Sequence, residues 1–361
     1  MKKLLFSAFD MNVGGIETSL LILLNTLVDK NYDITLVLEK KQGAFLKDLD
    51  NKIHIIEYKP SENKIVLVRK IINLQKRILF WLKHHNKYDF SASYATYSLV
   101  GSYTARIASK NCALWGHADY LMLYKNDASK VEEFFNVLNV SKFKKIIFVS
   151  KAGAESFCNI FPEQEEKVIF CNNLIDYRKI ESLAQEKVEE TKKKYTFVNV
   201  GRHDEKQKKL TRILEATKQL KEEDFDFEVL FVGEGSDTEK YKEMVKEYNI
   251  QDFVKFLGVK KNPYPYMKLA DSIILTSDYE GYPVVFLEAF VLNKPIITTD
   301  IADALEDIQN KFGIVTSKKI EEIYQAMKKF IQKGYEIKEK FEPEQYNKNI
   351  IEKIENIIND D

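Results

Sequence analysis

The chain has 361 residues, of which 45% are hydrophobic and 30% are charged, and its formal net charge is zero. This composition excludes a fibrous or disordered chain, and the length predicts two globular domains. A net charge of zero argues against a dedicated nucleic-acid-binding protein. The charge is unevenly divided, because residues 1–175 carry 24 Lys and Arg against 18 Asp and Glu, whereas residues 176–361 carry 31 against 37. We therefore expect the first half to prefer an anionic partner.

The cysteines and the apolar runs indicate a cytoplasmic protein. Cys112, Cys158 and Cys171 are odd in number and form no CxxC pair, so we expect neither structural disulfides nor structural zinc. The N-terminal sequence MKKLLFSAFD is interrupted at Asp10 and lacks a cleavage site, so it predicts a buried strand and not a signal peptide. No uninterrupted apolar stretch approaches the length that spans a membrane.

Short apolar strands alternate with helices in the first half. We expect strands at 3–9, 33–39, 52–58, 90–95, 110–116 and 145–150, and helices at 16–30 and 64–85. This alternation is typical of a doubly wound parallel sheet.

The pattern restarts after Asn172 and Asn173. We expect strands at 195–201, 227–233, 254–258, 271–277 and 294–300, and helices at 210–220 and 238–249. We place the domains at 1–175 and 176–340, with the charged stretch 177–194 as a linker and 341–361 as a C-terminal helix that packs back on the first domain. Ligands of such sheets bind at the carboxyl ends of the strands, so a cleft between the two domains is the expected site.

The segment SDYEGYPVVFLEAF, residues 277–290, contains two acids at a strand-to-helix connection. Pro283 suits the first position of a helix, whose N-terminal amides attract an anion. Glu280 lies beside that anion site, and Glu288 falls on the second helical turn. A buried Glu288 needs a fixed partner, such as a ligand hydroxyl. The alternative is that Glu288 faces solvent and Glu280 is an ordinary loop acid.

The segment VNVGRHDEKQKKLTRILEA, residues 198–216, places Arg202 after a strand and Lys208 before a helix. Two such cations can form a phosphate site. The spacing differs from GxxxxGK[ST], which disfavours a P-loop nucleotide hydrolase. The alternative is a solvated basic loop, because Lys206 and Lys209 lie in the same segment.

Two segments of the first half offer weaker signals. Gly14 and Gly15 follow the first strand and permit a close approach of backbone to a ligand, although a tight turn explains them equally well. His117 and Asp119 follow the strand at 110–116, where His117 could donate to a sugar or phosphate oxygen. A structural histidine is the alternative.

Together these segments resemble the retaining glycosyltransferases of family 4, which have the GT-B fold of two Rossmann-like domains facing across a cleft. EGYPVVFLE is similar to the E-x7-E motif of that family, and VGRHDEKQK is similar to its diphosphate-binding motif. VGEGSD, residues 256–277 and KPIITTD match its usual flanking blocks, as GGIE, WGH and FVSKAGAESF do in the first half. The resemblance covers most of the chain and is strongest from 195 to 300.

The resemblance implies a metal-independent retaining hexosyltransferase that uses a nucleotide-sugar, which we expect to be a UDP-sugar, and no cofactor. Arg202 and Lys208 would neutralise the diphosphate, Glu280 and the amides after it would hold the sugar, and Glu288 would bind the ribose. The implied catalytic residues are Glu280, His117, Arg202 and Lys208. The implied donor-binding residues are Gly14, Gly15, Arg202, Lys208, Gly258, Val259, Glu280, Gly281, Tyr282, Pro283, Val284 and Glu288.

Two features of the sequence bear on the donor and on metal. Asp224-Phe225-Asp226 has the letters of a DxD metal motif, but it precedes a strand, so we interpret it as a turn. The chain departs from the family pattern at residues 301–306, where a glycine-rich loop is usual, and at Lys151, where an acid is usual. These departures leave the donor sugar open.

Residues 64–87 contain seven Lys and Arg and no acid. Val68, Ile71, Ile72, Ile78, Leu79 and Leu82 form one helical stripe, which we expect to pack on the sheet as a Rossmann crossover helix. The basic face could still attract an anionic membrane surface weakly, and this would suit an acceptor linked to polyprenyl diphosphate.

The sequence therefore predicts a cytoplasmic enzyme, peripheral on the inner face of the cell membrane, that transfers a sugar to a glycan in the synthesis of a cell-surface polysaccharide such as a capsule. The same chemistry on a protein or soluble glycan is one alternative. A GT-B nucleotide-sugar epimerase is a second alternative, and an inactive partner subunit of a glycosyltransferase pair is a third.

Overall fold

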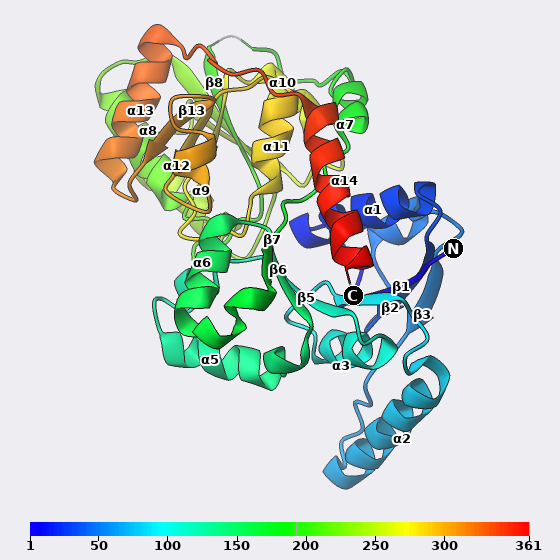
Figure 1. Cartoon of the computed structure of the whole chain (residues 1–361). Helices are drawn as coiled ribbons and strands as arrows, with labels where there is room; N and C mark the ends of the chain where they lie inside the picture. Colours follow the sequence, from blue (N-terminus) through cyan, green and yellow to red (C-terminus); the bar gives the residue numbers. More distant parts are fainter. Residues whose placement is uncertain (193, 361) are drawn as a thin grey trace. The chain divides into compact units, whose positions relative to one another are not determined.

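The computed structural model describes residues 1–192 and 194–360 and divides into two compact units (Figure 1). The first unit contains Met1–Leu174 and the C-terminal segment that begins at Tyr346, and the second contains Ile175–Gln345. Each unit is an α/β domain built on one parallel sheet. The two expected Rossmann-like sheets are thus present.

The sheet of the first unit has the strand order β3-β2-β1-β4-β5-β6-β7. Its strands are β1 (Lys3–Ala8), β2 (Asp33–Leu38), β3 (His54–Glu57), β4 (Phe90–Ser93), β5 (Cys112–Gly116), β6 (Lys145–Phe148) and β7 (Val168–Phe170). Its helices are α1 (Gly15–Asp29), α2 (Val66–His84), α3 (Leu99–Ala108), α4 (Tyr120–Leu123), α5 (Ala128–Val137) and α6 (Lys151–Ile160), with short 3-10 turns at Ala44–Asp48, Val140–Lys142 and Pro162–Lys167. The central strand β1 has Leu4, Leu5 and Phe6 fully buried, as the unbroken apolar run predicts for a strand covered on both faces.

The sheet of the second unit has the order β10-β9-β8-β11-β12-β13. Its strands are β8 (Tyr195–Val200), β9 (Phe227–Val232), β10 (Val254–Gly258), β11 (Ser272–Leu275), β12 (Ile296–Thr299) and β13 (Gly313–Thr316). Its helices are α7 (Tyr177–Leu183), α8 (Thr211–Glu222), α9 (Thr238–Glu247), α10 (Tyr264–Leu269), α11 (Val284–Val291), α12 (Ala304–Asp307) and α13 (Ile320–Lys333). Phe197, Phe227 and Phe231 lie at the centre of its core, where α8 and α13 pack together.

The C-terminal helix α14 (Pro343–Asn359) is anchored by a buried lysine of the first unit. Lys145 is 4% exposed, and its Nζ donates to the carbonyl of Ile357 at 2.7 Å and to Asn111 Oδ1 at 3.1 Å. A cation at the carbonyl end of a helix satisfies groups that have no helical partner. Ile350 and Ile354 complete the contact from the apolar side of the helix.

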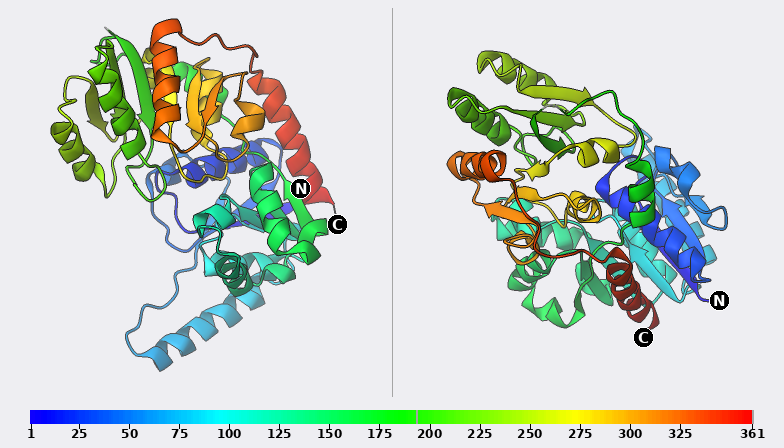
Figure 2. Two further views of the ribbon diagram at one scale, coloured as in Figure 1. Left: turned by 90° about the vertical axis from the view of Figure 1, so that its left-hand side faces the viewer. Right: turned by 90° about the horizontal axis from the view of Figure 1, so that it is seen from above.

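Two expectations about single segments are wrong. The stretch 177–194 is not simply a linker, because α7 occupies its first part and packs against α10 and α11 of the second unit, with Ile180 buried. The helix α2 does not pack its apolar stripe on the sheet, because Phe80 is its one buried residue. In Figure 1 and in the left view of Figure 2, α2 extends from the rest of the first unit and meets it near one end.

Candidate active site in the second unit

The sheet order of the second unit brings the two motif loops together. Strands β8 and β11 are neighbours, with Val198 paired to Ile273, although more than seventy residues separate them in the chain. The strand order reverses between these two strands, and loops at such a switch point lie side by side. The loop after β8 carries Arg202 and Lys208, and the loop after β11 carries Glu280. Their backbones touch where Asp278 N donates to the carbonyl of Gln207 at 2.8 Å.

Lys208 and Glu280 form a largely buried ion pair at this point. Lys208 Nζ donates to Glu280 Oε1 at 2.6 Å, and the two side chains are 22% and 10% exposed. Ser277 Oγ donates to the same oxygen at 2.8 Å, and Gln207 Nε2 donates to Glu280 Oε2 at 3.2 Å. Glu280 is therefore buried and fixed by three donors, and it is not a solvent-exposed loop acid.

Arg202 is joined to this pair through one amide. Its Nη2 donates to Gln207 Oε1 at 3.0 Å and lies 3.4 Å from Asp204 Oδ2, while the side chain is 63% exposed. Hydrogen bonds thus link the side chains of Arg202, Gln207 and Glu280 in that order. The guanidinium of Arg202, at the outer end of this network, is exposed to solvent. An exposed guanidinium beside a partly buried ammonium can bind an incoming anion and orient it.

A second ion cluster fixes the loop that carries Glu280. Arg212 Nη2 donates to Asp278 Oδ1 at 2.6 Å, and its Nη1 donates to the carbonyl of Thr276 at 2.8 Å. Lys209 Nζ lies 3.5 Å from Asp278 Oδ2. Thr276 Oγ1 in turn donates to the carbonyl of Lys209 at 3.0 Å. Lys209 has a φ of 52°. A non-glycine residue in the left-handed region is held there by its surroundings, so this cluster sets the direction of Lys208.

Two glycines of the VGEGSD block let the neighbouring loop lie close to Gly201 and His203. A Cβ on Gly233, whose φ is 141°, would lie 1.9 Å from the carbonyl oxygen of Gly201. A Cβ on Gly235 would lie 2.2 Å from the carbonyl oxygen of His203. His203 is buried among aromatic rings, its Nδ1 lies 2.9 Å from Thr238 Oγ1, and burial lowers its pKa to about 4. We interpret His203 as a structural support of the Arg202 loop.

Helix α11 begins at Val284, one residue later than expected, with Pro283 immediately before it in extended conformation. Glu288 on its second turn is 8% exposed, and Tyr264 Oη donates to Glu288 Oε1 at 3.2 Å. Burial raises the pKa of Glu288 to about 7, and the hydrogen bond from Tyr264 opposes this rise only in part. The alternative that Glu288 faces solvent is wrong. A carboxylate buried at this cost is suited to receive further hydroxyl donors from a ligand.

The remaining expected donor residues of this unit occupy the same loops. Gly281 and Tyr282 are buried, and Tyr282 Oη donates to Asp307 Oδ2 at 2.7 Å. Gly258 ends β10 with a φ of 72°, which favours glycine there, and Gly233 N donates to its carbonyl at 2.9 Å. Val259 is exposed. Val284 and Pro283 stand at the N-terminus of α11, where backbone amides are available to an anion.

Gly14, Gly15 and His117 belong to the first unit. Gly14 is the N-cap of α1 in an extended conformation, and a Cβ on it would lie 2.3 Å from Glu17 Oε2, so the Glu17 carboxylate stands over this turn. His117 follows β5, and its ring lies 4.5 Å from that of Tyr94. Burial lowers the pKa of His117 to about 3, and its Nε2 is buried without a hydrogen-bond partner among the described residues. A neutral imidazole with one unpartnered nitrogen can bind a ligand hydroxyl.

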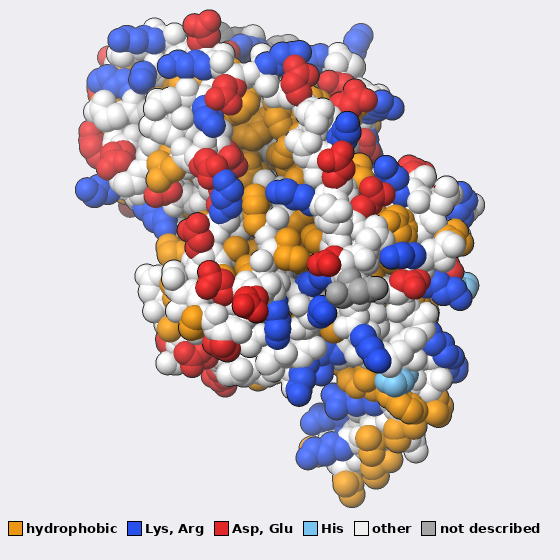
Figure 3. Space-filling model, viewed as in Figure 1, with side chains coloured by type: hydrophobic (Ala, Val, Ile, Leu, Met, Phe, Trp, Pro, Cys, Tyr) orange, Lys and Arg blue, Asp and Glu red, His pale blue; other side chains and the backbone are white. Residues whose placement is uncertain are grey.

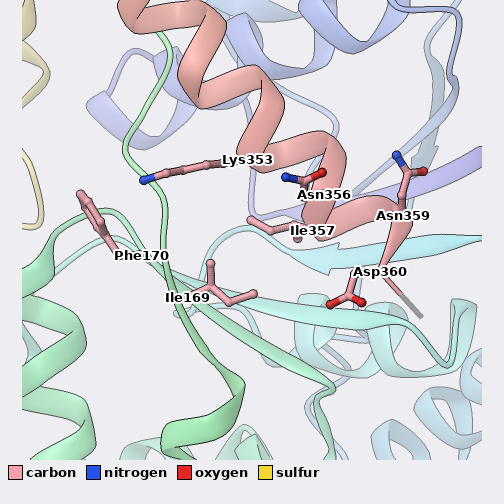
Figure 4. Close-up of a pocket in the computed structure, with 7 residues that line it drawn as sticks. All are labelled: Ile169, Phe170, Lys353, Asn356, Ile357, Asn359 and Asp360. Carbon is pink, nitrogen blue, oxygen red and sulfur yellow. The ribbon is translucent and has the colours of Figure 1, made fainter.

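An open depression also lies in the first unit, between β7 and the last turns of α14 (Figure 4). Its lining consists of Ile169, Phe170, Lys353, Asn356, Ile357, Asn359 and Asp360. Lys353 Nζ lies 4.9 Å from the centre of the Phe170 ring, a cation–π contact that joins helix to strand. We interpret the depression as part of the seam that anchors α14.

Two findings concern metal and membrane spans. Within residues 1–192 and 194–360, no group of three or more His, Cys, Asp or Glu side chains could hold a metal ion. Within the same residues, no helix is long and apolar enough to cross a membrane. Asp224, in the DxD-like sequence, has a φ of 58° and lies just before β9, as expected for a turn.

The chain is similar in sequence and in fold to known glycosyltransferases. Residues 181–351 match the family described as Glycosyl transferases group 1. The crystal structure of Anabaena Alr3699/HepE in complex with UDP and glucose superposes with a TM-score of 0.78 at 18% identity, covering 98% of this chain and 100% of that chain. The fold is therefore GT-B. The matched domain and this fold together support a glycosyltransferase of the GT-B class.

Two curated relatives extend the comparison. The N-acetylgalactosamine-N,N'-diacetylbacillosaminyl-diphospho-undecaprenol 4-alpha-N-acetylgalactosaminyltransferase of Campylobacter jejuni is 24% identical over 371 residues, with 96% of each chain covered. The uncharacterised glycosyltransferase MJ1059 of Methanocaldococcus jannaschii is 29% identical over 145 residues, which cover 39% of this chain. The match spans 36% of MJ1059.

Proposed function

We propose that the protein is a metal-independent, retaining glycosyltransferase that moves a sugar from a UDP-sugar to a glycan carried on polyprenyl diphosphate, in the synthesis of a cell-surface polysaccharide. The observation that carries the proposal is the partly buried Lys208–Glu280 pair at the switch point of the second sheet, followed by the buried Glu288. The UDP bound to the Anabaena protein and the diphospho-undecaprenol in the name of the Campylobacter relative support the choice of donor and acceptor.

The residues of the second unit suit the difficult step of this reaction. The bond between the anomeric carbon and the β-phosphate oxygen breaks, and negative charge accumulates on the departing diphosphate. Lys208 has three N–H donors, so it can keep Glu280 in place and still donate to a phosphate oxygen. Arg202 and the first amides of α11 add positive charge at the same end of the sheet.

Glu280 and Glu288 have different proposed roles. Glu280, fixed by Lys208, Ser277 and Gln207, would accept hydrogen bonds from the hydroxyls of the donor sugar. Glu288 would accept both ribose hydroxyls, and these donors would favour its ionised form. Backbone near Gly258 and Val259 would contact the base. We also propose that His117 and the amides of Gly14 and Gly15 take part in donor binding.

In the proposed transfer, the acceptor hydroxyl oxygen bonds to the anomeric carbon on the face that the diphosphate leaves. The acceptor proton passes to the departing phosphate oxygen, so the products are the lengthened glycan and the nucleoside diphosphate. No carboxylate pair flanking the bond is required, in contrast to the two-carboxylate scheme of glycoside hydrolases.

Donor class is tested by a thermal-shift screen of UDP, GDP, ADP and their sugars in buffer with EDTA. A ligand that binds only the folded state raises the melting temperature. We expect the shift from UDP and its sugars, and a smaller shift in Arg202→Ala and Glu288→Ala. A shift from GDP or ADP compounds alone would replace UDP in the proposal, and a shift that requires Mg²⁺ would remove the claim of metal independence.

Acceptor and stereochemistry are tested with an α-linked donor and two acceptors, one linked to polyprenyl diphosphate and one a soluble glycan. Proton NMR of the product should show an α linkage, because retention keeps the donor configuration. A β linkage would overturn retention. Preference for the soluble acceptor would overturn the lipid-linked assignment, and a changed sugar still attached to UDP without any acceptor would indicate an epimerase.

A further inference from the structure

Helix α2 (Val66–His84) has an apolar face that lies exposed throughout its length. Leu67 is 68% exposed and Leu82 is 60% exposed, and the residues between them on the same face are exposed as well. We call this face the outer stripe, and it consists of Leu67, Ile71, Leu74, Ile78, Trp81 and Leu82. Their spacing of three and four residues places them along one side of the helix.

The opposite side of α2 holds the helix to the first unit. Phe80 is 5% exposed, and its ring packs against the rings of Tyr58 and Tyr103. The distances between ring centres are 5.5 Å and 6.3 Å. Lys76 Nζ donates to the carbonyl of Lys59 at 2.6 Å, and Tyr103 Oη donates to the carbonyl of Arg77 at 2.9 Å. These contacts fix the rotation of the helix about its axis, so the outer stripe faces away from the unit.

Basic side chains occupy the other side of the helix and the residues that flank it. Residues 64–87 contain no acid and seven basic residues, which are Lys64, Arg69, Lys70, Lys76, Arg77, Lys83 and Lys87. Figure 3 shows hydrophobic side chains gathered along one side of this helix and Lys and Arg side chains along the other. The chain as a whole has a net charge of zero, so this concentration of positive charge is local.

We propose that α2 lies flat on the surface of an anionic lipid bilayer, with the outer stripe among the acyl chains and the basic side chains at the headgroups. A helix that combines an apolar face, a basic face and a tryptophan has the composition of an interfacial helix. The 19 residues of α2 extend about 28 Å. The helix is not apolar enough to cross a membrane. A second copy of this helix fits less well, because each copy brings seven positive charges and no acid that could pair with them. The lipid contact would hold whether or not the second unit transfers a sugar.

Vesicle co-sedimentation of the full chain tests the proposal. Vesicles of phosphatidylcholine alone are compared with vesicles that also contain phosphatidylglycerol. We expect at least about 10-fold stronger binding to the anionic vesicles, weakened by salt. Leu74→Gln with Ile78→Gln should reduce binding about 10-fold or more, because it removes apolar area from the stripe. Lys64→Gln, Lys70→Gln and Lys83→Gln together should remove the preference for anionic lipid.

Matched controls use exposed residues elsewhere in the chain. Leu99→Gln with Val137→Gln removes two exposed apolar side chains from other helices of the same unit. Lys240→Gln, Lys246→Gln and Lys329→Gln remove three exposed charges from the second unit. Both controls should bind vesicles as the unaltered chain does. Circular dichroism and the UDP thermal shift report whether each variant is folded.

Tryptophan fluorescence gives an independent measurement, because the chain contains two tryptophans. Trp81 is 44% exposed on the outer stripe, whereas Trp115 is buried in β5. Anionic vesicles should shift the emission to shorter wavelength in the unaltered chain and not in Trp81→Phe. Equal binding to both kinds of vesicle with no shift would overturn the proposal. So would a dimer in analytical ultracentrifugation that dissociates in the Leu74→Gln, Ile78→Gln variant without any lipid binding, since it would assign the stripe to a second copy.

Discussion

Lys208 Nζ lies 2.6 Å from Glu280 Oε1, across 72 residues of chain, because the strands that precede them are neighbours in the second sheet. The pair joins the two sequence motifs into one site. It also places a cation and a carboxylate at the end of the sheet where α11 presents its N-terminal amides. The first prediction follows from this pair.

Lys208→Met keeps most of the side-chain volume and removes the charge. We expect kcat/KM to fall about 10²–10³-fold, as when one preorganised donor to a developing charge is removed. Glu280 also loses a charged hydrogen bond, so unfolding should become easier by about 1.5–3 kcal/mol. Adding Glu280→Gln should restore stability without restoring activity. Denaturant titration and steady-state kinetics of the three variants measure both quantities, and full activity of Lys208→Met would refute the assigned role.

Glu288 should make donor binding depend on pH. Its pKa is raised to about 7, so it is largely protonated at pH 6 and ionised at pH 8. Ribose hydroxyls prefer the ionised carboxylate, so the affinity for a UDP-sugar should rise about 10-fold as pH increases through 7, with release of one proton. Calorimetric titration at several pH values measures the slope. Glu288→Gln should bind more weakly and without this slope, and an identical slope in that variant would contradict the role of Glu288.

The same carboxyl should lower stability as pH rises. The folded pKa of about 7 lies above the ordinary value of 4.5, so the folded state binds more protons between these two values. The free energy of unfolding therefore falls between pH 4.5 and 7, as the cost of burying the Glu288 charge develops, and it falls no further from this cause above pH 7. Glu288→Gln should raise the free energy of unfolding by up to about 3 kcal/mol at pH 8 and change it little below pH 4.5. A difference that does not vary with pH would show that Glu288 remains ionised in the folded protein.

Arg202 should contribute to binding and not to stability. Its side chain is 63% exposed, so Arg202→Ala should change the free energy of unfolding by less than about 0.5 kcal/mol. Its affinity for UDP should nevertheless fall about 10-fold, because a guanidinium to phosphate contact is lost. Lys206→Ala, an exposed cation of the same loop, is the control and should bind UDP normally. Equal losses in both variants would indicate a general charge effect of the loop.

Gly233 should tolerate no side chain. In Gly233→Ala the new Cβ would lie 1.9 Å from the carbonyl oxygen of Gly201, at a φ of 141°. Gly334→Ala is the control, because its φ of 64° is also unusual but no atom lies within 4 Å. The control should lose about 1–3 kcal/mol from backbone strain, and Gly233→Ala should lose at least about 1–3 kcal/mol more. Equal losses would show that the two loops do not lie as close as described.

Much of the architecture could be predicted from the alternation of apolar strands and helices, because parallel strands buried on both faces have continuous apolar runs. The short strand β13 was not anticipated, since Gly313–Thr316 has too few apolar residues to give a signal. The helix α2 was placed wrongly for a different reason. An amphipathic period is the same whether the apolar face meets a sheet or lies exposed, so Leu74 and Ile78 could not reveal which.

The site was predictable where charge and spacing coincided in one segment. Arg202 and Glu280 stand beside glycines in loops that follow strands, Lys208 precedes a helix, and Glu288 is an acid among apolar residues, which marked them as candidates. Gln207, Ser277 and Tyr264 gave no such signal. Tyr264 on α10 reaches Glu288 on α11 in a fold where both helices pack against α7, and no local pattern records that contact. Gln207 could have been suspected from its position next to Lys208.

The central claim is that the Lys208–Glu280 site transfers sugar from a UDP-sugar to a lipid-linked glycan. The most direct measurement is mass spectrometry of a polyprenyl-diphosphate-linked acceptor after incubation with a panel of UDP-sugars in EDTA. The account predicts an acceptor heavier by one sugar with the unaltered chain and with Lys240→Gln, and at least about 100-fold less product with Lys208→Met. No product from any donor, or equal product from Lys208→Met, would contradict it.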